Sequence, residues 1–472
     1  MGKKQLGRRD FLCNAASVAA GFSIPLFIPS DVLAQAGKPG ANERVNIGMI
    51  GLGGRAYQML DACAEVPQVR IVSICDCYPP RCTDFLKNAG QNQNWSSYED
   101  FRQMIARERL DAVMVETPTH ARAWIVIQAM LAGLDVYIEK PIALTVAEGR
   151  AIVRAAQRLQ RVTQVGTQQR SMPINNWASD LVKHGALGKV HTVIAPNYVG
   201  PIRWEKTSTK DVRGTVDPWW DAWTNQTELR PYDPQLHRSW GKWWDYDGGG
   251  GHFGVTGWGA HSFDQINRAL GTDCTGPLEV LLEEPVAMQQ TGKYEPRRAV
   301  GGVVQGETDS ADTGTAYHAY AKLRGPRAKV SMKFANGTTL KAHLEGDRGP
   351  GLGAIFIGEK GKLEINRNKL ASNPRELVQV PENPGPNKRN ETAYHVENWA
   401  ECIKSRRSCN ADIEIGQRAS TLCCLVNIAR QLGRVGETLH WDPVAERFTN
   451  CDEANQLLWR PRRRGYELPE LG

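Results

Sequence analysis

The chain has 472 residues, more than one typical domain holds, and this length predicts two domains with an appendage. Hydrophobic residues make up 41% and charged residues 23%, proportions that exclude collagen, coiled coil and extensive disorder. The net charge is +7, but Lys and Arg are scattered along the chain, so nucleic acid is not expected as a partner. The one dense basic run, Arg460–Arg464, is interpreted as solvated surface.

Residues 1–34 have the pattern of an export signal. Arg8 and Arg9 are followed by a Phe-Leu pair and a mildly apolar stretch, and Ala34 lies where a signal peptidase would cut. We therefore expect a Tat signal peptide and a periplasmic or otherwise exported protein, with a disordered basic tail as the alternative. The apolar stretch is too short and too interrupted to span a bilayer, so no stable membrane anchor is expected.

The cysteines do not predict a metal site. The chain has 11, and Cys75, Cys77 and Cys82 lie close together. A zinc site needs two well-spaced pairs or histidine partners, and neither is present. We expect most of the cysteines to be buried as small apolar residues, and the sequence places no disulfide.

After a linker at 35–44, residues 45–167 are predicted to form a dinucleotide-binding Rossmann domain. The apolar run 45–50 is typical of a buried parallel strand, and a glycine-rich loop and a helical pattern follow it. In such loops the first glycine makes the tight turn, the second lets the pyrophosphate approach, and a small third residue packs helix on strand. The predicted loop residues are Gly51, Gly53, Gly54, Arg55 and Ala56.

A second strand is predicted at 69–75 and ends in Asp76, where a carboxylate would take the ribose hydroxyls. Because Asp76 would repel a 2′-phosphate, NAD is expected as the cofactor. NADP stays possible because Arg55 or Arg81 could hold that phosphate.

Strands and helices continue to alternate, with strands at 110–115, 135–138 and 162–165 and helices between them. This alternation predicts a doubly wound parallel sheet of the α/β class. Ligands bind at the carboxyl ends of such strands. Two motifs lie at those ends and are assigned to cofactor binding: Thr117-Pro118-Thr119-His120 and Glu139-Lys140-Pro141.

Together these motifs and a later Gly259-Ala260-His261 resemble the Gfo/Idh/MocA oxidoreductase family. The resemblance implies that residues 168–472 form a substrate and oligomerisation domain, α+β in class, with an open, mostly antiparallel sheet. Its face would cover the nicotinamide and its back would support a homo-oligomer. Helices near 395–404 and 417–433 would pack beside that sheet.

The resemblance also assigns the catalytic groups. Lys140 would lie near the nicotinamide and the substrate hydroxyl, and His261 corresponds to the family's general base. One position departs from the pattern, because the family's Asp is replaced by Gly257. His252, Tyr198 and Asp264 are the candidates for its role, and the sequence does not choose among them.

Eight of the 14 tryptophans lie in one segment, an insertion predicted at 201–258. Aromatic faces stack on sugar rings, so the segment is interpreted as a carbohydrate-binding loop, with a satellite core that pins a long loop as the alternative. The substrate candidates are Tyr198, Trp219, Trp220, Arg230, His237, Trp243, Trp244 and Trp258.

Three functions fit these motifs. The first is an NAD(P)-dependent oxidoreductase that moves a hydride to or from a sugar or polyol carbon. The second is a glycoside hydrolase or lyase that uses tightly bound NAD transiently, through oxidation, elimination and reduction, as some exported relatives of the family do. The third is a catalytically silent protein that binds sugar and cofactor.

Overall fold

The computed structural model describes residues 39–40, 43–89, 93–205, 216–251, 253–290, 324–344, 350–385 and 389–470. Residues 45–472 form one compact unit, and residues 1–44 form another. The predicted signal peptide at 1–34 lies outside the described residues. Within the described part, no helix has the length and apolar character needed to cross a membrane.

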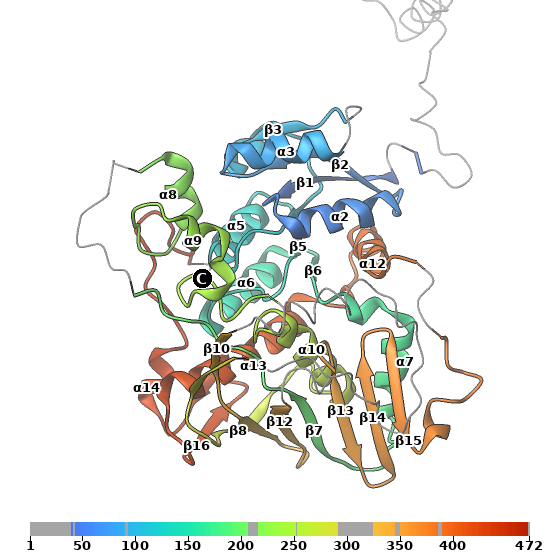
Figure 1. Cartoon of the computed structure of the whole chain (residues 1–472). Helices are drawn as coiled ribbons and strands as arrows, with labels where there is room; N and C mark the ends of the chain where they lie inside the picture. The colour runs from blue at the N-terminus through green and yellow to red at the C-terminus, as the bar shows by residue number, and fades with distance from the viewer. Residues whose placement is uncertain are drawn as a thin grey trace, which may run out of the picture. The chain divides into compact units, whose positions relative to one another are not determined.

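A six-stranded parallel sheet forms the centre of the N-terminal part of the larger unit (Figure 1). Its order is β3-β2-β1-β4-β5-β6, with β1 at Val45–Ile50, β2 at Val69–Cys75, β3 at Ser96–Tyr98, β4 at Ala112–Val115, β5 at Asp135–Ile138 and β6 at Thr163–Val165. β1, β4 and β5 are buried almost throughout, as expected of parallel strands covered on both faces. The predicted doubly wound sheet is confirmed.

Two groups of helices cover the parallel sheet. One face packs on α2 (Gly54–Ala64) and α3 (Pro79–Ala89), through residues such as Met59 and Phe85. The other face packs on α4 (Phe101–Arg107), α5 (Thr119–Leu131) and α6 (Val146–Leu159). The sequence analysis did not predict α3, β3 or α4.

The second half contains a nine-stranded sheet, in the order β15-β14-β13-β7-β12-β11-β8-β16-β17. Only β7 (Val190–Pro196) and β12 (Thr339–Leu344) pair in parallel, so the predicted mostly antiparallel sheet is confirmed. The other strands are β8 (Pro277–Leu282), β11 (Val330–Phe334), β13 (Ala354–Gly358), β14 (Gly361–Asn366), β15 (Lys369–Asn373), β16 (Thr438–Asp442) and β17 (Arg447–Phe448). Two further strands, β9 (Ala287–Gln290) and β10 (Arg324–Arg327), pair separately.

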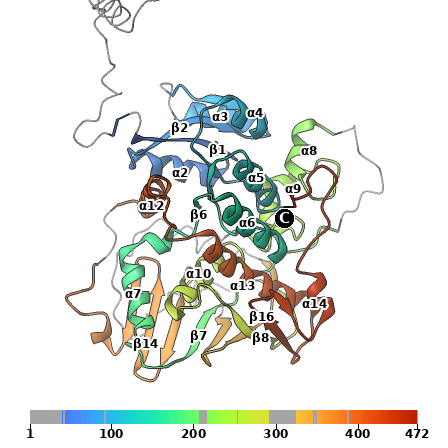
Figure 2. The ribbon, with the colours of Figure 1, turned by 180° about the vertical axis from the view of Figure 1, so that it is seen from behind.

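Helices join the two sheets. α13 (Ile413–Leu432) contacts α6 of the first half, β8 of the second and α10 (Trp258–Leu270), as the reverse view also shows (Figure 2). α10 packs in turn on α7 (Pro173–Lys183). This arrangement puts the first turn of α10, which carries His261, beside the carboxyl ends of the parallel strands.

The last two long helices were both expected beside the second sheet, and for α12 (Glu391–Ser405) this expectation was wrong. α12 returns to the parallel sheet, where Trp399 lies 5.8 Å from the Tyr137 ring and His395 bonds to the Val165 carbonyl oxygen. The Val396 and Trp399 side chains fill the same core cluster as α2 and β1. The amphipathic pattern of α12 predicts a buried face but does not say which sheet buries it.

The tryptophan-rich segment contains two short helices, α8 (Pro218–Thr224) and α9 (Pro234–Arg238), and one 3-10 turn, η3 (Trp240–Lys242). Trp220, Trp223, Leu236 and Tyr246 form a small core of their own. The segment is therefore a folded subdomain.

Candidate functional site

The glycine-rich loop after β1 fits a dinucleotide. Gly51 has a φ of +92°, and a Cβ there would lie 2.8 Å from the Thr117 backbone nitrogen, so only glycine is tolerated. A Cβ on Gly54 would meet open space. Gly53 is the N-cap residue of α2 and has no side chain to accept a hydrogen bond. N–H groups of the first helical turn are therefore available to phosphate oxygens. The small Ala56 is fully buried, as the packing of helix on strand requires.

Asp76 lies where the sequence analysis expected the ribose carboxylate. Its oxygens accept hydrogen bonds from the Leu52 and Tyr78 backbone nitrogens, at 2.8 and 2.9 Å, so it also holds the glycine-rich loop in place. Burial raises the pKa of Asp76. It lines a cavity of about 590 Å³ together with Gly51, Arg81 and Thr117. Of the two arginines considered for a 2′-phosphate, only Arg81 lines this cavity.

A second cavity, of about 490 Å³, brings together the two predicted catalytic residues. Lys140 at the end of β5 and His261 on α10 both line it, although they are far apart in the sequence. Arg55 and Glu139 lie in the same wall, and Glu116 lines both cavities. A dinucleotide that spans the glycine-rich loop can therefore extend from Asp76 in one cavity to Lys140 in the other.

His261 is 6% exposed, and its Nδ1 has no hydrogen-bond partner among the described residues. Burial lowers the pKa of His261 well below its ordinary value, and the positive charges of Lys140, Arg367 and Arg55 lower it further. The imidazole is therefore neutral at pH 7 and has a free ring nitrogen.

Lys140 is half-buried, and its Nζ donates a 3.0 Å hydrogen bond to the Gly257 carbonyl oxygen. Burial lowers the pKa of Lys140, and the neighbouring Glu139 carboxylate counteracts that effect. The bond connects the end of β5 to the start of α10. It thereby fixes the ammonium relative to His261.

Gly257, at the position of the family's Asp, cannot carry a side chain in this fold. A Cβ there would lie 1.7 Å from the carbonyl oxygen of Gly251. The glycine run 248–251 wraps closely around the start of α10, and Gly249 accepts bonds from the backbone nitrogens of Thr256 and Gly257.

The structure places another carboxylate, Asp247, in the cavity with Lys140. Asp247 Oδ2 accepts a 2.7 Å hydrogen bond from Thr119, and its Oδ1 accepts one from Thr256. Burial raises the pKa of Asp247, while both hydroxyl groups and the charges of Arg122 and Lys140 lower it. The sequence analysis missed this residue. The only signal was its position immediately before the glycine run.

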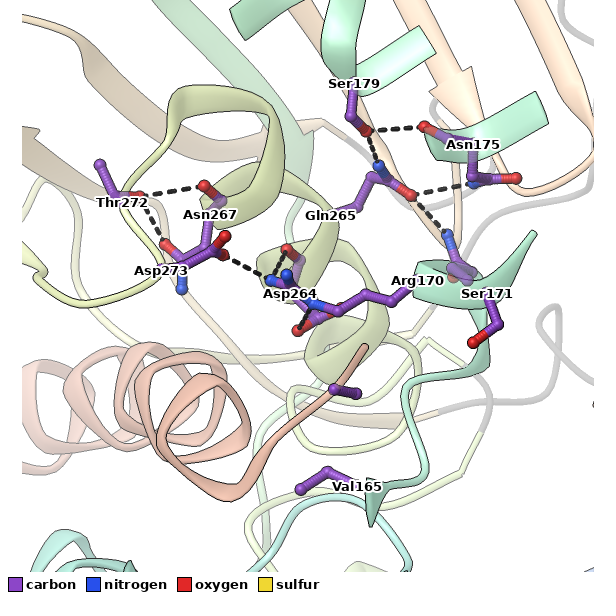
Figure 3. A network of polar contacts seen from close by, with 12 residues as sticks. Val165, Arg170, Ser171, Asn175, Ser179, Asp264, Gln265, Asn267, Thr272 and Asp273 are labelled. Carbon is purple, nitrogen blue, oxygen red and sulfur yellow. Dashed lines mark hydrogen bonds and ion pairs between the residues drawn. The ribbon is translucent and has the colours of Figure 1, made fainter. Parts of the chain in front are cut away.

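Two of the earlier candidates for the family's Asp, Asp264 and Tyr198, do not line the cavity. Asp264 is held by Arg170, whose Nε lies 2.8 Å from each carboxylate oxygen, in a polar network that also includes Asp273 (Figure 3). The Tyr198 hydroxyl donates to the Gly351 carbonyl oxygen within the core. His252 lies outside the described residues.

The two motifs at the strand ends have different surroundings. Glu139 forms a 2.7 Å ion pair with Arg55, and both side chains line the Lys140 cavity. Thr117 and Pro118 line the Asp76 cavity. His120 is fully buried and lines neither cavity, because its Nε2 bonds to the Trp223 carbonyl oxygen. His120 therefore anchors the tryptophan-rich subdomain to the parallel sheet.

Most of the predicted substrate residues are built into the subdomain. Trp220 stacks on Trp223 at 4.7 Å, and the His237 ring is enclosed by aromatic rings that include Trp219 and Tyr78. Among the eight candidates, only Trp258 lines the Lys140 cavity, and only Trp219 lines the Asp76 cavity. Tyr198, Trp220, Arg230, His237, Trp243 and Trp244 line neither. Trp240, from the same insertion, also lines the Lys140 cavity.

The basic run near the C-terminus, expected as solvated surface, instead holds the subdomain. Arg462 pairs with Glu148 of α6 at 2.5 Å, and Arg463 pairs with Asp221 of α8 at 2.8 Å. Arg460 lies over the Trp244 ring at 4.2 Å. We call residues 460–466 the C-terminal strap. Tyr466, at its end, lines the Asp76 cavity.

Within the described residues, no group of three or more His, Cys, Asp or Glu side chains could hold a metal ion. All ten cysteines there are free thiols.

Known proteins resemble this chain in sequence and fold. Residues 45–167 match the model of an oxidoreductase family with an NAD-binding Rossmann fold, and residues 180–302 and 303–468 match its C-terminal alpha/beta domain. A glycosyl hydrolase family 109 protein from Shewanella pealeana is 26% identical over 239 residues, 47% of this chain and 52% of that protein. This chain therefore matches about half the length of that curated relative.

Two solved structures share the fold. One is aldose-aldose oxidoreductase from Caulobacter crescentus complexed with glycerol, with a TM-score of 0.53 and 19% identity over 84% of this chain and 99% of that one. The other is WlbA dehydrogenase from Bordetella pertussis in complex with NADH and UDP-GlcNAcA, with a TM-score of 0.53 and 14% identity over 84% and 99%. With both family models matched, the chain belongs to the Gfo/Idh/MocA oxidoreductase family and contains its NAD-binding Rossmann fold.

Proposed function

We propose that this protein oxidises and reduces a hydroxyl-bearing carbon of a sugar or polyol, with Lys140 and His261 as the catalytic residues. The observation that carries this proposal is that both line one cavity beside the glycine-rich loop. NAD, when bound, accepts or returns the hydride. Gly51, Gly53, Gly54 and Asp76 would hold it.

His261 would take the proton of the substrate hydroxyl. It is neutral at pH 7, so one of its two ring nitrogens carries a lone pair that can accept this proton. The surrounding positive charges make the imidazolium form costly, which favours rapid return of the proton when the carbon is reduced.

Lys140 would hold the same substrate hydroxyl group in the position that hydride transfer requires. Its ammonium has three N–H bonds, and one is committed to the Gly257 carbonyl oxygen, so two can reach substrate. Asp247 would act as a positioning residue, because its charge attracts the ammonium from the opposite wall. In this role it replaces the Asp that the family carries at position 257.

A polyhydroxylated substrate is supported by the lining of the cavity. Charged groups of both signs face it, and two indole rings, Trp240 and Trp258, supply flat apolar surface. Sugars combine these two kinds of surface, since their hydroxyl groups form hydrogen bonds and their C–H faces stack on aromatic rings.

A second candidate is redox-neutral cleavage of a glycoside. Elimination requires a base for the C–H proton and an acid for the leaving group, beyond the groups that hydride transfer uses. Asp247, whose pKa burial raises, lies in the cavity with His261 and Lys140 and supplies such an extra group. The sequence similarity to a family 109 glycosyl hydrolase points the same way.

The test uses Lys140→Ala and His261→Ala with a panel of free sugars and aryl glycosides. Each variant should lower kcat by about 100-fold or more, the range for lost acid–base help, with NAD affinity nearly unchanged. His440→Ala, at an exposed position on β16, is the control and should match the wild type. Full activity of His261→Ala would contradict the assignment. Formation of an oxidised or reduced sugar without cleavage indicates an oxidoreductase, and aglycone release without net reduction of NAD indicates cleavage.

A further inference from the structure

Glu116 has no role in the chemistry described so far, yet it lies where the two cavities meet. It follows β4 directly and is 7% exposed. Neither carboxylate oxygen forms a hydrogen bond to another described residue. A buried carboxylate without partners is costly, so a positively charged ligand in the adjoining cavities would stabilise its ionised form.

Charged groups surround Glu116 from every element packed against it. Arg55 approaches from α2, Arg122 from α5 and Glu139 from the end of β5, and the Cys63 thiol also faces it from α2. Arg55 is paired with Glu139, and Arg122 is bonded to the Pro141 carbonyl oxygen and to Thr119. Among these groups, Glu116 is the one whose two carboxylate oxygens both lack a hydrogen-bond partner within the described residues.

From this geometry we infer that Glu116 is a cofactor-sensing carboxyl group, which is ionised beside oxidised NAD and protonated beside NADH. The inference rests on the proposed function only in requiring that NAD occupies both cavities. The oxidised nicotinamide ring carries a positive charge and the reduced ring carries none. Glu116 would bind a proton when the positive charge is absent and release it when the charge is present.

Local electrostatics support this coupling. Burial and the Glu139 charge raise the pKa of Glu116 well above its ordinary value, whereas Arg55 and Arg122 lower it. A nearby positive charge lowers a buried carboxyl pKa by about one to three units. The two cofactor states therefore give Glu116 two different pKa values.

Linkage fixes the sign of the effect. Below both pKa values Glu116 is protonated in either complex and gives no preference. As pH rises through the lower value, which belongs to the complex with oxidised NAD, Glu116 ionises there first and strengthens that complex. The ratio of Kd for NAD⁺ to Kd for NADH should therefore fall as pH rises, by about tenfold or more in total.

The experiment measures both Kd values by calorimetry, without sugar, between about pH 5 and pH 9, a range that brackets ordinary and raised carboxyl pKa values. In Glu116→Gln the ratio should stay near the low-pH value of the wild type at every pH. Glu376→Gln, at an exposed position that lines neither cavity, is the matched control and should keep the wild-type curve.

A measurement on the wild type alone guards against a misfolded variant. Binding of NAD⁺ near the middle of the transition should release more protons than binding of NADH, measured from the calorimetric heats in two buffers of different ionisation enthalpy. A flat ratio in the wild type, or a Glu116→Gln curve that follows the wild type, would overturn the inference. Because no sugar is present, either result would leave the proposed chemistry at Lys140 and His261 intact.

Discussion

At the scale of single residues, Asp247 lies in the cavity with Lys140, and Gly257 leaves no space for a side chain at the start of α10. Asp247 and Thr119 are hydrogen-bonded although 128 residues separate them. No local pattern could predict this contact, because Asp247 precedes a run of glycines that reads as a loop. Gly51 and Asp76 could be predicted because they belong to one short strand–loop–helix unit with fixed spacing.

The glycine at position 257 gives a prediction at the same scale. Gly257→Ala should lower the free energy of unfolding by about 3 kcal/mol, because overpacking costs about 1–3 kcal/mol and the obstacle here is backbone. Gly54→Ala, whose Cβ meets open space, should change stability by less than about 1 kcal/mol. Urea denaturation compares the two. Equal stabilities would show that the glycine run 248–251 does not pack around α10 as described.

At the scale of elements, the clustered tryptophans single out residues 201–258, but they do not show whether their rings bind a ligand or form a core. Clustered aromatic residues serve equally as a binding platform or as a small core, and composition does not distinguish them. Here Trp220 and Trp223 fill a core, while Trp240 and Trp258 reach the Lys140 cavity. α3 was missed for a related reason, because it begins at Pro79 and Pro80, which read as a turn although proline is favoured in the first helical turn.

The C-terminal strap gives the prediction for this scale. Arg463 bonds to Asp221 and to the Asn225 carbonyl oxygen, so it holds the end of α8, whose residues Trp219 and Trp223 line the Asp76 cavity. Arg463→Ala should weaken NAD binding by about tenfold, the equivalent of one lost buried charge-assisted contact. Arg464→Ala, at the exposed neighbouring position, is the control. If NAD titrations give the same affinity for both variants, the C-terminal strap does not support the cofactor site.

At the scale of the whole molecule, alternating strands and helices determine the parallel sheet from local patterns, and the family resemblance supplied the second sheet. The sequence could not predict that α12 packs on the parallel sheet and that α13 contacts both halves. The apolar pattern of a helix predicts a buried face but not which element covers that face. Residues of the parallel-sheet part and of the tryptophan-rich subdomain line both cavities, and the start of α10 adds Trp258 and His261 to one of them.

We expect NAD to be a resident group that is regenerated in every cycle at the Lys140–His261 cavity. Export of an already folded protein would allow the cofactor to be loaded in the cytoplasm, and little free nucleotide is expected outside it. The most direct measurement is to purify the full-length protein from the periplasm, quantify the nucleotide released on acid denaturation, and follow turnover of its sugar substrate with no NAD added. The account predicts near-stoichiometric NAD(H) and many turnovers. An exported apo-protein whose turnover scales with added NAD and releases free NADH would contradict it.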